Sequence, residues 1–194
     1  MSYTIITNQK DVVKTLEYCQ FDHHLNRFRD PIKQQEAMCK AMETKQGKMA
    51  LAVHNHSIVG YTIILEPETD ERWRGLDFLK MLGVIEVAPR LRNQKVAKKL
   101  LQDLFSLEET EKSIVISLEC CWHWDLKMTN GDPLQYRSML KHVLESVGFQ
   151  EFRTNEPDIA CYDVNFMMAR VGSEISIDQV NQFTKLAMDN RYLS

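Results

Sequence analysis

The chain has 194 residues, of which 44% are hydrophobic, and its formal net charge is −3 at pH 7. A chain of this length buries roughly 70% of its unfolded surface, so we expect a single domain over residues 1–194. The acidic balance argues against a nucleic-acid-binding protein, and no apolar run is long enough to cross a membrane. With no signal-peptide pattern and five cysteines outside any disulfide framework, we expect a cytoplasmic protein with reduced thiols.

Strand and helix signals alternate along the chain, which indicates a mixed α/β fold. Asn8 and the pair Asp30-Pro31 are typical helix starts, and Gly148 is a typical helix end. In chain order, the sequence predicts a strand at 3–7, a helix after Asn8, a helix from Asp30 to near Gly47, a hairpin of strands 49–53 and 57–65 around Asn55-His56, a loop at 66–75, a short helix at 77–82, strands at 83–87 and 113–119, a loop at 128–133, a helix at 134–147, strands at 149–154 and 162–171, and a C-terminal helix at about 177–192.

Residues 87–101 predict a strand that runs directly into a basic amphipathic helix. Its cations crowd the helix start and its acids the far end, although the helix dipole prefers the reverse by roughly 0.3–1 kcal/mol per charge. Backbone N–H groups at such a start form a cradle for phosphate, and nearby cations strengthen it. The alternative is a solvated basic surface. The apolar positions that define the helix are Val96, Ala97, Leu100, Leu101, Leu104 and Leu107.

This strand–helix junction resembles the acetyl-coenzyme A motif of the GNAT acetyltransferases. Val87, Pro89, Arg92 and Ala97 match the motif, whereas Lys95 replaces its first glycine. Further stretches resemble one branch, the bacterial acetoin-utilisation acetyltransferases, from about residue 30 to the C-terminus. Its most specific part is the run at 122–127. The other matching stretches are Gly60-Tyr61, Glu71-Arg72-Trp73, residues 85–89, residues 155–158 and residues 168–172.

The resemblance implies the GNAT fold, a mixed sheet flanked by helices, and acetyl-coenzyme A as cosubstrate without a metal. It implies transfer of acetyl to a lysine of AMP-forming acetyl-coenzyme A synthetase, which inactivates that enzyme and would make the synthetase the protein partner. The oligomeric state stays open. The resemblance places pantetheine and the acetyl group on Ile85 and Val87, and the pyrophosphate on Arg92, Asn93, Gln94, Lys95, Val96 and Ala97. The backbone of Lys95 could still serve the cradle if its φ is negative.

Acetyl transfer to an amine also needs a base, because a lysine of pKa about 10.4 is neutral at pH 7 only at a cost of about 4.6 kcal/mol. Glu86 is the candidate, mostly because the resemblance places it close to the acetyl group. It also lies between apolar Ile85 and Val87, surroundings that raise a carboxyl pKa toward the working range. The alternative is a glutamate that faces solvent or pairs with an arginine. Glu119 is the reserve candidate.

The sequence does not identify a single acid that would protonate the departing thiolate. Leu144 stands where many GNAT relatives have a tyrosine. Tyr136, Tyr162 and His123 are the candidate substitutes, with Tyr136 as the predicted catalytic residue, and a water molecule is the alternative.

The run Trp122-His123-Trp124 is predicted to line the groove that binds the protein substrate, because tryptophans commonly pack or bind partners. A corner of the core is the alternative, and one histidine with one aspartate is too few for a metal site. Two other functions stay open: a GNAT enzyme for a small-molecule amine, and a non-catalytic regulator that binds the synthetase. Lys95 and Leu144, the two departures from the motif, favour the regulator.

Overall fold

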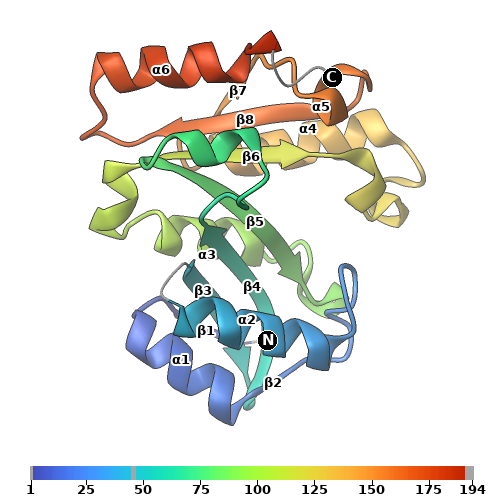
Figure 1. Cartoon of the computed structure of the whole chain (residues 1–194). Coiled ribbons are helices and arrows are strands. Elements are labelled where there is room, and N and C mark those ends of the chain that lie inside the picture. The colour runs from blue at the N-terminus through green and yellow to red at the C-terminus, as the bar shows by residue number, and fades with distance from the viewer. Residues whose placement is uncertain (1, 45–46, 191–194) are drawn as a thin grey trace. The chain divides into compact units, whose positions relative to one another are not determined.

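The computed structural model describes residues 2–44 and 47–190, with the strand order β1-β3-β4-β5-β6-β8-β7 and β2 paired with β4 (Figure 1). This confirms the predicted mixed α/β fold of strands flanked by helices. The chain divides into two compact units. The N-terminal unit comprises residues 1–65 and 83–107, and the C-terminal unit comprises residues 66–82 and 108–194.

The N-terminal unit combines a largely antiparallel set of strands with three helices. β1 pairs antiparallel with β3, β3 antiparallel with β4, and β2 parallel with β4. β5 enters this unit at Gly83. The elements are β1 (Thr4–Ile6), α1 (Gln9–Tyr18), β2 (Gln20–Phe21), α2 (Pro31–Glu43), β3 (Gly47–His54), β4 (Ser57–Leu65), the second part of β5 (Leu79–Val87), a 3-10 turn η2 (Pro89–Leu91) and α3 (Val96–Leu104).

Capping and turn residues in the sequence correctly predicted where several of these elements begin or end. The side chain of Asn8 accepts hydrogen bonds from the first turn of α1, and Asp30 does the same for α2, so both predicted caps are confirmed. Asn55 and His56 both have positive φ, 48° and 59°, which gives the hairpin a turn of the type that two-residue loops favour. α2 ends at Glu43, earlier than predicted, and Gly47 begins β3 instead.

β4 separates the helices of this unit, because its neighbouring residues face opposite sides. The Gly60 side of β4 faces α3, where a Cβ at Gly60 would lie 3.4 Å from Leu100 Cδ1 and 3.2 Å from the Glu86 carbonyl oxygen. Tyr61 faces the opposite side and contacts Gln34 of α2. Glycine at position 60 therefore lets β4, β5 and α3 approach closely, while Tyr61 lies on the side of the Glu86 carboxylate.

The core of the C-terminal unit lies between its strands and the last helix of the chain. Its elements are η1 (Arg72–Gly75), the first part of β5, η3 (Glu108–Lys112), β6 (Ile114–Glu119), η4 (Cys121–His123), η5 (Leu126–Thr129), α4 (Pro133–Glu145), β7 (Gln150–Phe152), α5 (Pro157–Ala160), β8 (Phe166–Val171) and α6 (Ile177–Ala187). β6 pairs parallel with β5 and antiparallel with β8, which also pairs antiparallel with β7. The core of this unit includes Trp73, Leu79, Ile114, Ile116, Met167, Ala169, Phe183 and Ala187.

The predicted short helix at 77–82 is wrong, because β5 already begins at Leu79. Leu79, Lys80 and Met81 pair with residues 114–116 of β6, and Leu79 is fully buried. Backbone pairing with a distant strand thus decides the structure of a segment whose apolar residues could also have formed a helical turn.

The C-terminal helix is shorter than predicted, since α6 ends at Ala187 rather than near residue 192. Residues 191–192 lie outside the described part of the chain. The Ala187 carbonyl accepts hydrogen bonds from Asn155 N at 3.0 Å and Thr154 Oγ1 at 2.8 Å. Buried Arg72 also donates to it and forms an ion pair with Glu156 at 2.9 Å. These tertiary hydrogen bonds take the place of helical ones at the end of α6.

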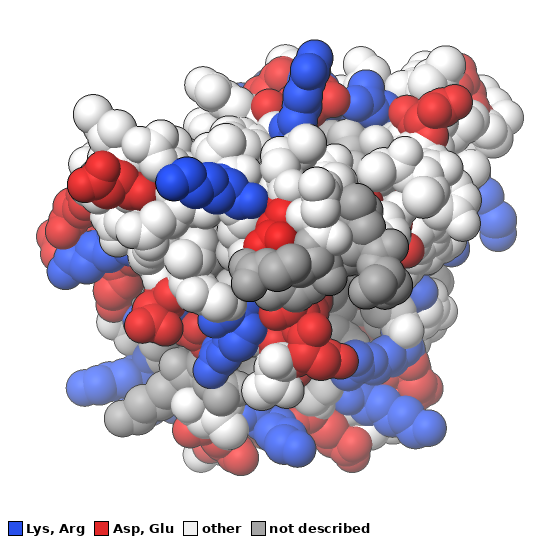
Figure 2. All heavy atoms as spheres, turned by 45° about the horizontal axis from the view of Figure 1, so that its top comes forward, with Lys and Arg blue, Asp and Glu red and all other residues white. Residues whose placement is uncertain are grey.

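Three further features concern the surface charge, the helices and the cysteine thiols. On the face in Figure 2, Lys and Arg side chains are interspersed with Asp and Glu. Within the described residues, no helix combines the length and apolar character that a membrane span requires. All five cysteines are free in this structure.

Candidate functional site

Glu86 of β5 is a buried carboxylate held at both oxygens. Only 7% of the residue is exposed. The backbone N–H of Arg27 donates to Oε1 at 2.9 Å, and the Tyr61 hydroxyl donates to Oε2 at 2.9 Å. Both donors come from the N-terminal unit, Arg27 from the loop after β2 and Tyr61 from β4. The solvent-facing alternative for Glu86 is therefore excluded.

The surroundings of Glu86 act on its protonation in opposite directions. Burial raises the pKa of the Glu86 carboxyl above its usual range. The hydrogen bonds from Arg27 N–H and Tyr61, together with the positive charges of Arg92 and Arg27, oppose this shift without cancelling it. A carboxyl group with a raised pKa and an ordered position has the properties of a general base, which is the predicted role of Glu86.

The predicted pyrophosphate cradle follows directly after β5. The chain passes through η2 and then through residues 92–95 into α3. Lys95 is the residue that caps α3, and its side chain accepts no hydrogen bond from the first turn, because an ammonium group has no acceptor. The N–H groups of a first helical turn have no partner within the helix, so this start can offer them to an anion. Ile85, Val87, Arg92 and Ala97 are partly buried, Val96 is buried, and Asn93, Gln94 and Lys95 are exposed.

Lys95 has the backbone conformation that favours glycine. Its φ is +60° and its ψ is 19°, in the left-handed region, so the negative φ that the sequence analysis set as a condition for the cradle is not observed. Asn93 also has a positive φ, of 63°. A side chain in this region costs roughly 1–2 kcal/mol relative to the right-handed conformation, and glycine avoids the cost. Lysine at this position therefore has a backbone conformation that glycine would adopt without this cost.

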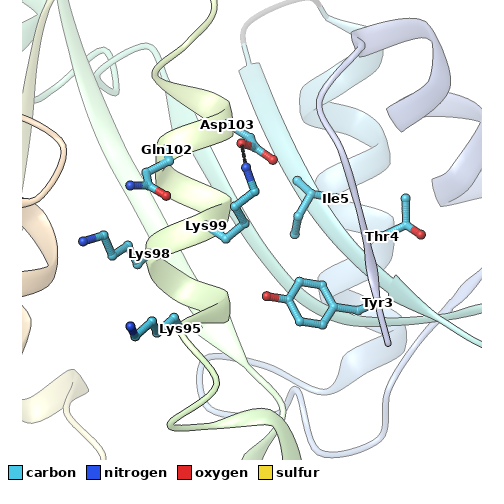
Figure 3. A pocket seen from close by; sticks show the side chains of 8 residues that line it. All are labelled: Tyr3, Thr4, Ile5, Lys95, Lys98, Lys99, Gln102 and Asp103. Carbon is cyan, nitrogen blue, oxygen red and sulfur yellow. Dashed lines mark hydrogen bonds and ion pairs between the residues drawn. The ribbon is translucent and has the colours of Figure 1, made fainter. Parts of the chain in front are cut away.

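A groove beside α3 gathers three lysines (Figure 3). Its volume is about 640 Å³. Lys99 forms an ion pair with Asp103 at 2.6 Å, one turn further along the helix. The groove is lined by Lys95, Lys98, Lys99, Gln102 and Asp103 of α3 and its cap, and by Tyr3, Thr4 and Ile5 at β1. Three of the cations near the start of α3 therefore line this one groove.

Lys95→Gly is expected to raise the free energy of unfolding by up to about 1 kcal/mol, because it relieves the left-handed strain at that position. Acetyl-coenzyme A should still bind, since the backbone N–H groups would keep their positions. Urea unfolding and calorimetric titration with acetyl-coenzyme A would measure both effects.

Gln94→Gly is the matched control for this change. Gln94 is exposed in the same loop but is not among the residues with positive φ, so glycine there should destabilise the protein by roughly 0.5–1 kcal/mol. A loss of acetyl-coenzyme A binding by tenfold or more in Lys95→Gly would contradict the backbone cradle and assign the contact to the lysine ammonium group.

The aromatic residues predicted to bind the substrate divide into two groups, all within the C-terminal unit. Trp122 is 45% exposed and contacts the ring of Tyr162 edge to face, with centroids 5.2 Å apart, and His123 is also exposed. Trp124 is only 4% exposed and stacks on Tyr136 at 5.2 Å. Trp124 is therefore buried at a corner of the core, which was the alternative to a substrate-binding role. Trp122 and His123 remain accessible to a partner.

The structure leaves Tyr136 as a partly buried side chain in this aromatic stack. Leu144, at the position of the usual tyrosine, is fully buried and can provide no proton. Glu119, the reserve base, accepts a hydrogen bond from Ser117, and burial raises its pKa.

Two polar groups near the site had no signal in the sequence. Tyr61 entered the resemblance only as part of a matching pair, and its hydrogen bond to Glu86 joins residues 25 positions apart. Asp22, His23 and His24 cluster closely enough to hold a metal ion. The Asp22 carboxylate, however, is already bound by Arg90 at 2.5 Å and by His24 Nδ1 at 3.1 Å. Burial opposes ionisation of Asp22, but hydrogen bonds from His24 and Arg90 outweigh it and lower its pKa.

Comparisons with known proteins were made for the whole chain. No protein-family model matches it. The chain is 36% identical over 182 residues to the acetoin utilization protein AcuA of Bacillus licheniformis, and the alignment covers 93% of this chain and 86% of that protein.

Two solved structures extend this similarity to the fold. The acetoin utilization protein from Exiguobacterium sibiricum 255-15 has a TM-score of 0.88 and 28% identity, with 99% of this chain and 97% of that chain covered. An acetyltransferase of the GNAT family from Staphylococcus aureus Mu50 has a TM-score of 0.51 and 17% identity, with 87% and 98% covered. The second similarity shows the fold alone.

Proposed function

Because the chain belongs to the AcuA family of acetoin utilization proteins and has the fold of the GNAT acetyltransferases, we propose that it transfers acetyl from acetyl-coenzyme A to a lysine of AMP-forming acetyl-coenzyme A synthetase and thereby inactivates it. Family and fold support acetyl-coenzyme A-dependent N-acetyltransferase activity, and the sequence resemblance supports the choice of target. The proposal places the protein in the cytoplasm, where acetyl-coenzyme A is available.

The observation that carries this proposal is the continuity between Glu86 and the start of α3. A buried carboxylate with a raised pKa lies on the strand that leads, within ten residues, into a basic helix start without a capping side chain. The proposed acetyl donor carries a pyrophosphate, an anion that suits such a helix start. Arg92 and Lys95 add positive charge at that start. The residue types present therefore fit the proposed cosubstrate.

Glu86 would act on the amine. The attacking lysine must be neutral, and removing its proton at pH 7 costs about 4.6 kcal/mol if it titrates normally. The Glu86 carboxylate can accept this proton directly or through one water. The amine nitrogen then forms a bond to the acetyl carbonyl carbon, and the bond from that carbon to sulfur breaks. The thiolate leaves with a proton from Tyr136 or from water.

The protein substrate would be bound at least partly by the exposed ring of Trp122 with neighbouring His123. An accessible tryptophan is a common anchor for a partner protein, and a lysine can also lie over its face. Trp124 would support this segment from the core through its stack with Tyr136. We retain Trp122 and His123 as the proposed substrate contacts on this basis.

Mass spectrometry of purified AMP-forming acetyl-coenzyme A synthetase, incubated with this protein and acetyl-coenzyme A, tests the proposal. We expect one acetylated lysine and a parallel loss of synthetase activity, with neither in a reaction without acetyl-coenzyme A. A stable complex without acetylation would instead identify a non-catalytic regulator. Acetylation of a small amine but not of the synthetase would identify a small-molecule acetyltransferase.

A further inference from the structure

We propose that Tyr61, oriented by Gln34, is the residue that positions the Glu86 carboxylate for proton abstraction. The inference rests on the proposed function, because it assigns a role to Tyr61 only if Glu86 is the base. The Tyr61 hydroxyl contacts the Glu86 carboxylate. It acts through Glu86 and is therefore a positioning residue.

Packing in the core holds the Tyr61 ring in place independently of its hydrogen bond to Glu86. The residue is fully buried, and its ring packs against Phe21 with centroids 4.9 Å apart and an interplanar angle of 44°. From this position the hydroxyl donates to Glu86 Oε2 at 2.9 Å. A buried tyrosine hydroxyl usually has a polar partner, and here that partner is the candidate base. A carboxylate bound this way at one oxygen and by Arg27 N–H at the other has little freedom to rotate.

Gln34 of α2 completes the arrangement on the other side of the hydroxyl. Gln34 is only 2% exposed, and its side chain lies close enough to the Tyr61 hydroxyl to lower the Tyr61 pKa. Since the Tyr61 proton is given to Glu86, the phenol oxygen must accept from the Gln34 amide, which donates through nitrogen. Within the described residues, Gln34 Oε1 has no hydrogen-bond partner. An amide N–H donated to the phenol oxygen would extend the observed bond from Tyr61 to Glu86 into a chain that begins at Gln34.

The Glu86 oxygens keep capacity for the substrate. Each carboxylate oxygen can accept about two hydrogen bonds, and the contacts described use one at each oxygen. One acceptor direction per oxygen is therefore left for an amine or a bridging water.

The groups around Glu86 and Tyr61 determine how the loss of the Tyr61 hydroxyl would change the pH dependence of the reaction. The groups that face Glu86 are the Tyr61 hydroxyl from β4, the backbone and charge of Arg27 from the loop after β2, and the charge of Arg92 after β5. The positive charge of Arg29 acts to lower the pKa of Tyr61. Burial and the adjacent Glu86 raise the pKa of Tyr61, so its hydroxyl keeps its proton throughout an ordinary assay range. A neutral donor favours the charged carboxylate, and its removal must raise the Glu86 pKa further.

The test is the pH dependence of kcat/KM for acetyl transfer by Tyr61→Phe. This change removes one hydroxyl and keeps the ring. The acid limb of the profile reports the base in the free enzyme, and it should move to higher pH by about one unit, the effect of losing one hydrogen bond to a charged group. Below the limb the rate should fall about tenfold relative to the wild type, whereas at high pH the difference should shrink.

Thr62→Val is the matched control. Thr62 is the next residue of β4, is fully buried, and its hydroxyl has no hydrogen-bond partner within the described chain. Removing this hydroxyl should leave the acid limb in place. Gln34→Leu provides a second variant if Tyr61→Phe does not fold, and it should shift the limb in the same direction by a smaller amount.

Three outcomes separate the inference from the proposed function. An upward shift in Tyr61→Phe or Gln34→Leu, absent in Thr62→Val, supports the positioning role. A limb that stays in place in folded Tyr61→Phe and Gln34→Leu, while Glu86→Gln is inactive, overturns the positioning role but leaves Glu86 as the base. Full activity of Glu86→Gln removes Glu86 from the mechanism, and the positioning role falls with it.

Discussion

Glu86→Gln is expected to lower kcat/KM for amine acetylation by about 10²–10⁴-fold, the usual contribution of a positioned base. Glutamine keeps the size of the side chain but has no basic oxygen at neutral pH. Acetyl-coenzyme A binding should change little, because the predicted cradle lies at residues 92–97 rather than at the carboxylate. Steady-state kinetics and calorimetric titration of acetyl-coenzyme A would measure the two effects separately.

The fold of this variant needs its own check. The Glu86 carboxylate accepts hydrogen bonds from Arg27 N–H and from Tyr61 at different oxygens, and an amide offers only one acceptor oxygen. One of the two donors must therefore lose its partner or turn away. A buried donor without a partner costs roughly 1–3 kcal/mol. A urea unfolding curve would show whether the loss of rate occurs in a folded protein.

Glu119→Gln is the comparison that decides between the two candidate bases. The Glu119 pKa is raised by burial, as is that of Glu86, so a raised pKa alone does not choose between them. Its described donor is a single serine, Ser117, whereas Glu86 is held by two. If Glu86 is the base, Glu119→Gln should retain its rate within a few fold. A large loss in Glu119→Gln with a normal rate in Glu86→Gln would reverse the assignment.

The sequence predicted those parts of the fold that depend on neighbouring residues. Asn8, Asp30 and the Asn55-His56 turn act through their own backbone or through the next few residues, so their chemistry can be read locally. Leu79 was misjudged because its strand exists only through pairing with residues 114–116. The two-residue strand β2 was missed for the same reason, since it is defined by pairing with Ser57 and Ile58.

The candidate site shows the same limit. Glu86 could be chosen as a base from its apolar neighbours and from the resemblance. The partners that order it, Arg27 and Tyr61, lie 59 and 25 residues away, and nothing in the local sequence connects them. Trp122 and Trp124 illustrate the problem on the surface: the sequence offers two similar rings, and packing against distant residues, among them Tyr136 and Phe166, buries Trp124.

Gly172→Ala is expected to destabilise the C-terminal unit by about 3 kcal/mol, through overpacking and lost hydrogen bonds. A Cβ at Gly172 would lie 2.5 Å from the carbonyl carbon of Glu111 and 2.7 Å from its Cα. Backbone cannot move aside as a flexible side chain can, so η3 would have to shift away from the end of β8. Urea unfolding would measure the loss as a lower midpoint at similar slope.

The shift would disturb a set of contacts that converge on Glu111. Gly172 N donates to Ser113 O at 3.0 Å, Ser173 N donates to Glu111 Oε2 at 2.8 Å, and Glu174 N donates to Glu111 O at 3.0 Å. Arg170 forms an ion pair with the same glutamate. Hydrogen bonds contribute roughly 0.5–1.5 kcal/mol each, so displacement of Glu111 costs more than the steric overlap alone.

Gly75→Ala distinguishes this effect from a general intolerance of alanine for glycine. Gly75 belongs to the same unit, is exposed, and a Cβ there would meet no atom within 4 Å. Its substitution should change the free energy of unfolding by less than about 0.5 kcal/mol. Equal stability of the two variants would contradict the close approach of Gly172 to Glu111. A loss confined to Gly172→Ala, with Glu86 chemistry retained below the unfolding transition, would show that the β8–η3 contact stabilises the fold without taking part in acetyl transfer.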